Sequence, residues 1–430
     1  MTHPIKCSIK EENPQFCHLT VDIPCPIVNE LYQEIALAQK SEIQTVGFSK
    51  YSTPLSYIQQ HYKNSITDHI KEFLFKFFLI NYLQEFLHQK KLRLFGEPRI
   101  LDIHVEPEQD AIFEFELSLS KPIDFREWKS FPFKAPKRKN YKDIDRQVES
   151  FIKQEHDAKK QITDENITVG DWVCFDIGLC SASNIPLLNN HHESAWIKIG
   201  SEEADIPFQE LFVGKKRGDS FCTDHHCLQE YFSTSINTRY NFSLSIQEIV
   251  PHAYFCFDDF KHHFRLKSNK DVHEKLIEIF SYRDDLSQRR GIVEEALKLL
   301  ISKHHIETPH YLILRQQKLV LEAVQSNPDY QVYKTEPTFK DFIRQLATKQ
   351  VREMILIDQL AVDENIKINN QDLKAYLNLL KRARTKEFIY FTPPPTKIEG
   401  QEMPIPSGLL KRTCLREKTL NHVIHHLTRK

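Results

Sequence analysis

The sequence predicts a multidomain α+β protein with a mixed N-terminal domain, a small β-rich module and a long all-helical C-terminal region. Three observations lead to this fold class. Strand-like alternation of apolar and polar residues flanks two helical patterns within the first 120 residues. A second set of short strand patterns fills residues 165–250, and the chain from about Asp258 onward has almost only helical periodicity. A chain of 430 residues is long enough for about two to four such domains.

The first 120 residues predict an antiparallel sheet and a helical hairpin. Phe113, Phe115 and Leu117 alternate with polar residues, which is the period of a strand with one buried face. Gly96-Glu97-Pro98 ends the preceding helical pattern, because glycine and proline interrupt helices. The expected elements are a strand pair at 6–24, a helix at 27–40, a long helix at 55–91, and strands at 99–105 and 111–119.

The segment between the two helical patterns, residues 45–54, forms a polar tip. Gly47 can adopt backbone angles that other residues avoid, and Pro54 suits the first turn of the following helix. Between them lie the aromatic Phe48 and the cation Lys50, which are residue types suited to docking on another surface. An ordinary helix–helix turn has a similar composition, so the rest of the chain must decide between the two interpretations.

The remaining chain predicts a linker, the β module and the helices. Residues 121–140 contain three prolines and a basic run at 137–139, which favours an extended linker before a charged helix at 141–161. The clearest strands of the module are expected at 171–177 and 240–246. The helices expected beyond the module include 288–305, 309–326, 338–365, 371–389 and 407–428.

Composition argues against several classes of protein. Hydrophobic residues make up 40% of the chain and charged residues 27%, as in soluble globular proteins. Only ten glycines occur, and we find neither a Walker loop nor a Rossmann fingerprint, so we expect no nucleotide and no other cofactor. The net charge is −1, but residues 381–430 hold eleven Lys or Arg against four Asp or Glu. This local excess suits a polyanionic partner, although a solvated helix face would have the same composition.

The sequence predicts a cytoplasmic protein with no membrane partner. The first residues lack the apolar core of a signal peptide, and the richest apolar run, 73–80, is interrupted by Lys76 and too short for a bilayer. Nine cysteines without a Cys-x-x-Cys pair fit a reducing compartment. The segment 222–227 holds two Cys and two His but matches no zinc spacing, so we expect no metal site. The His-His pairs at 191–192, 262–263, 304–305 and 425–426 are expected to be solvated.

The order of these domains resembles trigger factor, a family of bacterial chaperones that sit at the ribosomal exit tunnel. The family's tip reads Gly-Phe-Arg-x-Gly-Lys-x-Pro, and this chain keeps its Gly, Phe and Pro. Ser49, Tyr51 and Ser52 replace its Arg, second Gly and Lys, which removes two cations from the docking site. The resemblance implies that the ribosome, through ribosomal protein and rRNA, is contacted by Gly47, Phe48, Ser49, Lys50 and Pro54.

The β module resembles the FK506-binding type of peptidyl-prolyl isomerase that these chaperones carry. Asp171-x-Val173-x-Phe175-Asp176 is similar to a strand of that domain, and Ile206-Pro207-Phe208 is similar to its Ile-Pro-Gly-Phe without the Gly. The family's Gly-rich loop is absent, and residues 184–194 stand in its place. An apolar pocket would favour the twisted amide, although the same aromatics could simply form the module's core. The implied pocket residues are Asp176, Ile206, Phe208, Tyr231 and Phe242.

The resemblance implies a division of labour along the chain. Residues 1–120 would form the ribosome-binding domain with its helical-hairpin tip, 121–164 the linker and linker helix, 165–250 the isomerase-like domain and 251–430 the helical chaperone domain. The expected function is an ATP-independent chaperone that binds nascent and unfolded polypeptides and assists folding and export, with a weak isomerase activity. The alternatives are a free prolyl isomerase with substrate-binding helices and a periplasmic chaperone of similar build. The missing signal peptide argues against the second alternative.

Overall fold

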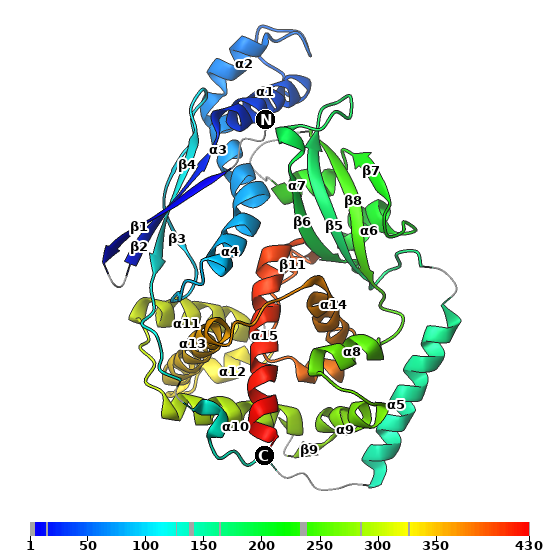
Figure 1. The fold of residues 1–430 in the computed structure, drawn as a ribbon. Coiled ribbons are helices and arrows are strands. Elements are labelled where there is room, and N and C mark those ends of the chain that lie inside the picture. Colours follow the sequence, from blue (N-terminus) through cyan, green and yellow to red (C-terminus); the bar gives the residue numbers. More distant parts are fainter. Residues whose placement is uncertain are drawn as a thin grey trace.

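The computed structural model describes residues 5–13, 16–125, 127–136, 142–162, 165–232, 239–283, 286–325 and 327–429. The basic run at 137–139 lies outside these ranges. Among the described residues, no helix has the length and apolar character needed to cross a bilayer. Figure 1 shows the N-terminal domain and the β module side by side, above a helical region that surrounds α15.

The N-terminal domain contains a four-stranded antiparallel sheet in the order β1-β2-β4-β3. Alternate residues of β2 and β4, such as Leu19 and Phe115, are buried on one face, as the period-two pattern predicts. This face packs against the helices of the same domain. The strands are β1 (Lys6–Asn13), β2 (Phe16–Ile23), β3 (Arg99–His104) and β4 (Ala111–Ser118).

The helices of this domain are shorter than the sequence predicts. The pattern expected as one helix at 55–91 divides into three α-helices and a π-helical turn, because Tyr62 leaves helical angles and the run Phe75–Leu79 takes a wider turn. Such turns interrupt α-helices without ending them. The elements are α1 (Cys25–Glu42), α2 (Leu55–His61), α3 (Lys63–Leu74), η1 (Phe75–Leu79) and α4 (Ile80–Gln89).

The β module is a five-stranded antiparallel sheet in the order β13-β6-β5-β8-β7. Helices α6 and α7 cover one face, and α14 and α15 pack on the other. Its edge strand β13 comes from residues 405–406, so the sheet extends beyond the expected segment 165–250. The elements are β5 (Trp172–Cys180), β6 (His192–Lys198), α6 (Ile206–Phe212), β7 (Ser220–Thr223), α7 (His226–Phe232), β8 (Asn241–Val250) and β13 (Ile405–Pro406).

The helical region is built around α15 (Figure 1). Neighbouring helices pack against α15 and bury residues on several of its sides. The helix expected at 371–389 ends at Leu379, where the Thr385 hydroxyl donates to the free Leu379 carbonyl. Helix α5, which follows the linker, packs on α9. The bounds are α5 (Lys142–Gln161), α8 (Phe257–Phe264), α9 (Asn269–Phe280), α10 (Gln288–Lys303), α11 (His310–Gln325), α12 (Tyr330–Lys334), α13 (Phe339–Asp363), α14 (Asn370–Leu379) and α15 (Ser407–Thr428).

Short elements complete the fold. Two two-residue hairpins and four 3-10 turns connect the longer elements within the described residues. They are η2 (Trp128–Ser130), η3 (Leu188–Asn190), η4 (Glu203–Asp205), β9 (Tyr282–Arg283), β10 (Leu286–Ser287), η5 (Thr385–Phe388), β11 (Lys397–Ile398) and β12 (Gln401–Glu402).

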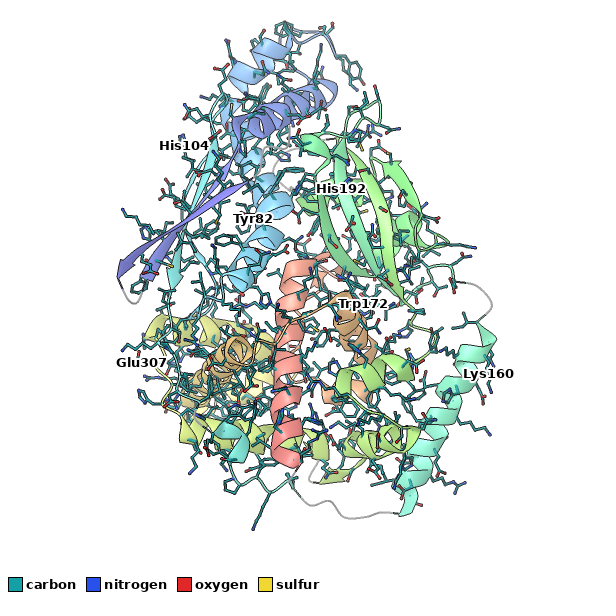
Figure 2. All side chains as sticks on the ribbon, viewed as in Figure 1. Tyr82, His104, Lys160, Trp172, His192 and Glu307 are labelled. Atoms are coloured by element: carbon teal, nitrogen blue, oxygen red, sulfur yellow. The ribbon has the colours of Figure 1, made fainter. Side chains whose placement is uncertain are left out.

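The N-terminal domain and the β module share one hydrophobic core. Asn81 of α4 donates to Glu193 of β6 and also to the Ser194 carbonyl, 3.0 Å away. Tyr82 and His192 lie along this boundary (Figure 2), where a cavity of about 500 Å³ separates α4 from β6 and α15. The two domains therefore form a single packed unit in this structure.

Candidate binding surfaces

The tip connects α1 to α2 as an exposed loop, residues 43–54. Gly47 has a φ of +92°, a left-handed angle that favours glycine, and a Cβ there would meet no atom within 4 Å. The glycine is therefore needed for its backbone conformation rather than for space. Pro54 precedes the first turn of α2 with an extended backbone, and the Ser49 hydroxyl hydrogen-bonds the Ser52 hydroxyl at 2.7 Å.

The apolar groups that the tip exposes differ from those expected. Phe48 is half-buried because its ring packs 5.2 Å from the ring of Tyr57. Val46 is instead 97% exposed and Tyr51 is 57% exposed, with the Lys50 ammonium 5.1 Å from the Tyr51 ring. Sequence reasoning missed Val46 and Tyr51, although an apolar residue beside a turn glycine was a usable signal. The loop thus presents a valine, a tyrosine and a cation to solvent.

The aromatic residues expected to line the isomerase pocket gather only in part. Phe242 of β8 stacks on Phe232 of α7 at 5.3 Å, and Tyr231 contacts the same Phe232 ring edge-on at 4.8 Å. Phe208 of α6 is buried in the shared core, while Ile206 at the start of that helix is 45% exposed. Phe232, which sequence reasoning missed, is the ring that joins the others.

Asp176 does not share this aromatic face. It pairs with Ser194 and Ser245 across β5, whereas Phe242 pairs with Leu179. Positions 176 and 179 differ by an odd number, so their side chains point to opposite faces of the sheet. Burial raises the pKa of the Asp176 carboxyl, while a hydrogen bond from Ser194 and the nearby His192 lower it. The structure therefore separates this carboxylate from the aromatic residues.

Helix α3 and the turn η1 cover the aromatic face. The rings of Phe73 and Phe77 lie 5.3 and 5.5 Å from the ring of Phe232. The Lys76 ammonium donates to the Tyr231 carbonyl at 2.9 Å. Burial in this contact raises the pKa of Tyr231, and the nearby Glu193 raises it further. The N-terminal domain thus covers the aromatic face of the β module.

A second exposed apolar surface lies on the arm, formed by α11, α12 and α13. The two long helices pack through Val320, Ile343 and Ala347. Six large apolar side chains of the arm stay between 44% and 64% exposed. Exposed apolar side chains on these three helices offer separate contact points that another chain can use. The six are Tyr311, Leu314, Leu319, Val332, Tyr333 and Phe342.

The segment 222–227 forms a strand end and the start of α7. The His225 Nδ1 atom lies 3.1 Å from the Cys227 sulfur, and Cys227 is buried whereas Cys222 is exposed. Within the part of the chain that the structure describes, no three His, Cys, Asp or Glu residues are placed to hold a metal ion. The described cysteines are all free thiols.

These features define a multidomain α+β protein that presents an exposed loop at one end and a helical arm with apolar side chains at the other. The chain belongs to the trigger factor family. Residues 5–154 match the family model described as bacterial trigger factor protein, and residues 270–388 match the model of the trigger factor C-terminus. The expected fold class and the family resemblance are therefore confirmed.

Several relatives are similar over most of their length. The trigger factor of Geobacter metallireducens is 20% identical over 383 residues, which cover 86% of this chain and 87% of the relative. That of Rickettsia massiliae is 20% identical over 442 residues, covering 97% and 93%. A solved structure described as "Promiscuous Substrate Recognition in Folding and Assembly Activities of the Trigger Factor Chaperone" covers 98% of this chain and 100% of that chain, with 14% identity and a TM-score of 0.37.

Proposed function

We propose that this chain is a cytoplasmic, ATP-independent chaperone that docks on the ribosome near the exit tunnel through its tip. The exposed Val46 and Tyr51 beside Lys50 carry this proposal, because they form a small apolar surface with one cation and no carboxylate between residues 43 and 61. Apolar contact would supply affinity, and the cation would favour a partner rich in phosphate. Membership of a chaperone family supports the same role.

The clients in this proposal are nascent and unfolded polypeptides bound along the arm. Exposed side chains such as Leu314 and Phe342 offer separate apolar contacts on a polar background. Each contact is weak on its own, so a client can leave without nucleotide hydrolysis. We propose the same segments as above: 1–120 for docking, 121–164 for the linker, 165–250 for the isomerase-like module and 251–430 for client binding. Clients released from the arm would then fold or be exported.

Prolyl isomerisation is proposed as a weak accessory activity. The aromatic rings around Phe232 are apolar enough to favour a twisted amide. They are covered by α3 and η1, and Asp176 faces the other side of the sheet. Because the aromatic rings are covered and Asp176 is on the opposite face, a chaperone role is favoured over the alternative of a free isomerase.

The test is co-sedimentation with purified ribosomes. A triple variant, Val46→Ser with Lys50→Gln and Tyr51→Ser, should lose most ribosome binding while its far-UV circular dichroism stays unchanged, because these side chains contribute little to the core. Ile100→Ser is the matched control, since Ile100 is also an exposed apolar residue of the N-terminal domain but lies on β3. Undiminished binding of the triple variant would contradict the proposal.

A further inference from the structure

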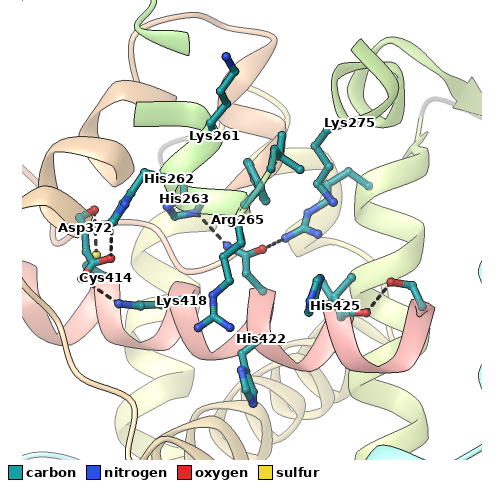
Figure 3. A pocket seen from close by; sticks show the side chains of 16 residues that line it. Lys261, His262, His263, Arg265, Lys275, Asp372, Cys414, Lys418, His422 and His425 are labelled. Atoms are coloured by element: carbon teal, nitrogen blue, oxygen red, sulfur yellow. Dashed lines mark hydrogen bonds and ion pairs between the residues drawn. The ribbon is translucent and has the colours of Figure 1, made fainter. Parts of the chain in front are cut away.

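A strongly basic pocket lies in the helical region, and none of its residues belongs to the tip or the arm. It has a volume of about 470 Å³ and is bounded by α8, α9, α10, α14 and α15 (Figure 3). Its wall combines five Lys or Arg side chains and four histidines with a single carboxylate. These residues are Lys261, Arg265, Lys275, Arg289, Lys418, His262, His263, His422, His425 and Asp372.

Each carboxylate near the pocket pairs with one of its cations, while Glu278 Oε2 and Glu417 Oε1 accept no hydrogen bond among the described residues. Asp372 accepts from Lys418 at 2.8 Å, from His262 at 3.0 Å and from a backbone amide of its own helix start. Two further carboxylates pair with cations of the pocket wall. Glu278 Oε1 lies 2.9 Å from Lys275 Nζ, and Glu417 Oε1 lies 3.7 Å from Arg289 Nη2. Three carboxylates against five cations leave a net charge of +2 with the histidines neutral, so the pocket has an excess of positive charge.

Two arginines offer donors that no described residue satisfies. Arg289 is fully buried, and its Nη2 atom donates to Asn421, but its Nε and Nη1 atoms have no hydrogen-bond partner among the described residues. Buried polar groups are normally paired. Glu417 Oε1, 3.7 Å from Arg289 Nη2, also lacks a hydrogen bond among the described residues, so this part of the wall is incompletely satisfied. Arg265 ends α8 with a left-handed φ of 55° and extends over α15 toward Lys418 and His422 (Figure 3). Arg265 is exposed, and its guanidinium makes no hydrogen bond or ion pair with any residue in the described ranges, so its donors are open to solvent and to a ligand.

The lowered pKa values of the pocket histidines reflect burial and the same positive charge. The pKa of His263 is lowered to about 3, first by burial and then by the nearby Arg289. Burial lowers the pKa of His425, and neighbouring cations that include Arg265 lower it further. The expectation that the four His-His pairs are solvated is wrong for His263 and His425, which are partly buried in this wall. It is also wrong for the partly buried His191 and His426 and for the buried His304. Neutral imidazoles can still donate one N–H each.

We propose that this pocket binds a small inorganic polyphosphate such as pyrophosphate or tripolyphosphate. Guanidinium N–H groups match the geometry of phosphate oxygens. Arg265 offers a complete fork, and Arg289 offers two single donors, Nε and Nη1, on opposite edges of its guanidinium. The volume falls in the usual range of about 300–1,000 Å³ for small-molecule sites. An anion with several charges is required, because a single carboxylate would leave the excess positive charge in place. The bound anion would cross-link the helices around α15.

The experiment is calorimetric titration of the full chain with sodium tripolyphosphate. Saturable one-site binding is expected, with the affinity reduced about tenfold or more in Arg265→Gln, as for the loss of one charge-assisted contact. Lys267→Gln is the matched control, because this exposed lysine is two residues away and lies outside the pocket wall. Its affinity should stay within about twofold of the parent. Arg289→Gln should weaken binding as well, and Arg265→Gln decides the question if the Arg289 variant does not fold.

Three results would overturn the proposal. The first is the absence of saturable binding at millimolar tripolyphosphate. The second is equal weakening by Arg265→Gln and Lys267→Gln, or equal binding of sulfate at matched ionic strength, since both would indicate attraction to net charge alone. The third is much tighter binding of ATP than of tripolyphosphate, which would mean that a base and not the phosphate chain is recognised. Equal affinity for ATP and tripolyphosphate supports the phosphate chain as the recognised group.

Discussion

At the scale of single residues, His69 links the N-terminal domain to the β module. It is fully buried on α3, hydrogen-bonds the Tyr240 hydroxyl and lies with its ring 5.7 Å from the Tyr240 ring. Burial, together with the nearby Lys76, lowers its pKa from 6.5 to about 4. The neutral imidazole is therefore the form that fits between the two domains.

The contact at His69 should weaken in mild acid. When the domains separate, His69 regains a pKa near 6.5, so the separated form binds more protons between pH 6.5 and about 4. The contact is fully stable above pH 6.5 and loses up to about 3 kcal/mol as the pH falls toward 4. Amide hydrogen exchange in α3 and β8 should accelerate from pH 7 to pH 5 beyond the intrinsic change. In His69→Gln this additional acceleration should disappear, and its persistence there would show that another group is responsible.

The site residues show where sequence reasoning succeeded and where it failed. Gly47 and Pro54 have the backbone roles expected of them, because these roles follow from local conformation. Phe48 was expected to be exposed but packs against Tyr57 in the first turn of α2, a contact that no local pattern reveals. Asp176 was grouped with Phe242 by family motif, although alternation along β5 already indicated that it faces away from Phe175 and Ile177.

At the scale of elements, α3 and η1 act as a cover for the aromatic face of the β module. The π-helical turn brings Phe77 and Phe78 together on the buried side of the chain, and Phe77 reaches the Phe232 ring. The sequence predicted one continuous helix here because a π turn leaves the apolar pattern almost unchanged. The strand pairs and α15 were predicted closely, since their periodicity is regular and their ends coincide with turns or prolines.

Removing this cover should increase isomerase activity. We expect low activity of the parent chain toward a short Xaa-Pro peptide, and higher activity in His69→Asp, because a buried carboxylate beside Tyr240 disfavours the closed contact. His104→Asp on the exposed strand β3 is the matched control and should leave the rate unchanged. A protease-coupled peptide assay measures the rates. If exchange data show that the contact has opened in His69→Asp and the rate is still unchanged, the aromatic face is not an isomerase site.

At the scale of the whole molecule, the β module packs against both the N-terminal domain and the helical region. Strand β13 from residues 405–406 completes the sheet of the β module, and Trp196 on that sheet packs with Tyr376 of α14. Deleting 165–250 would therefore expose buried surfaces of α14 and α15. Contacts between distant segments of this kind have no local sequence signature, whereas the order of the domains does.

The central claim is that the tip meets the ribosome while the arm meets the client. Photo-crosslinking on translating ribosomes tests it most directly, with the photoreactive residue placed at Tyr51 of the tip or at Phe342 of the arm, both exposed. The proposed function requires crosslinks from position 51 to ribosomal components and from position 342 to the nascent chain. A photoreactive residue placed at the exposed Ile100 on β3 should give neither product. Crosslinks from position 342 to the ribosome and none from position 51 would contradict it.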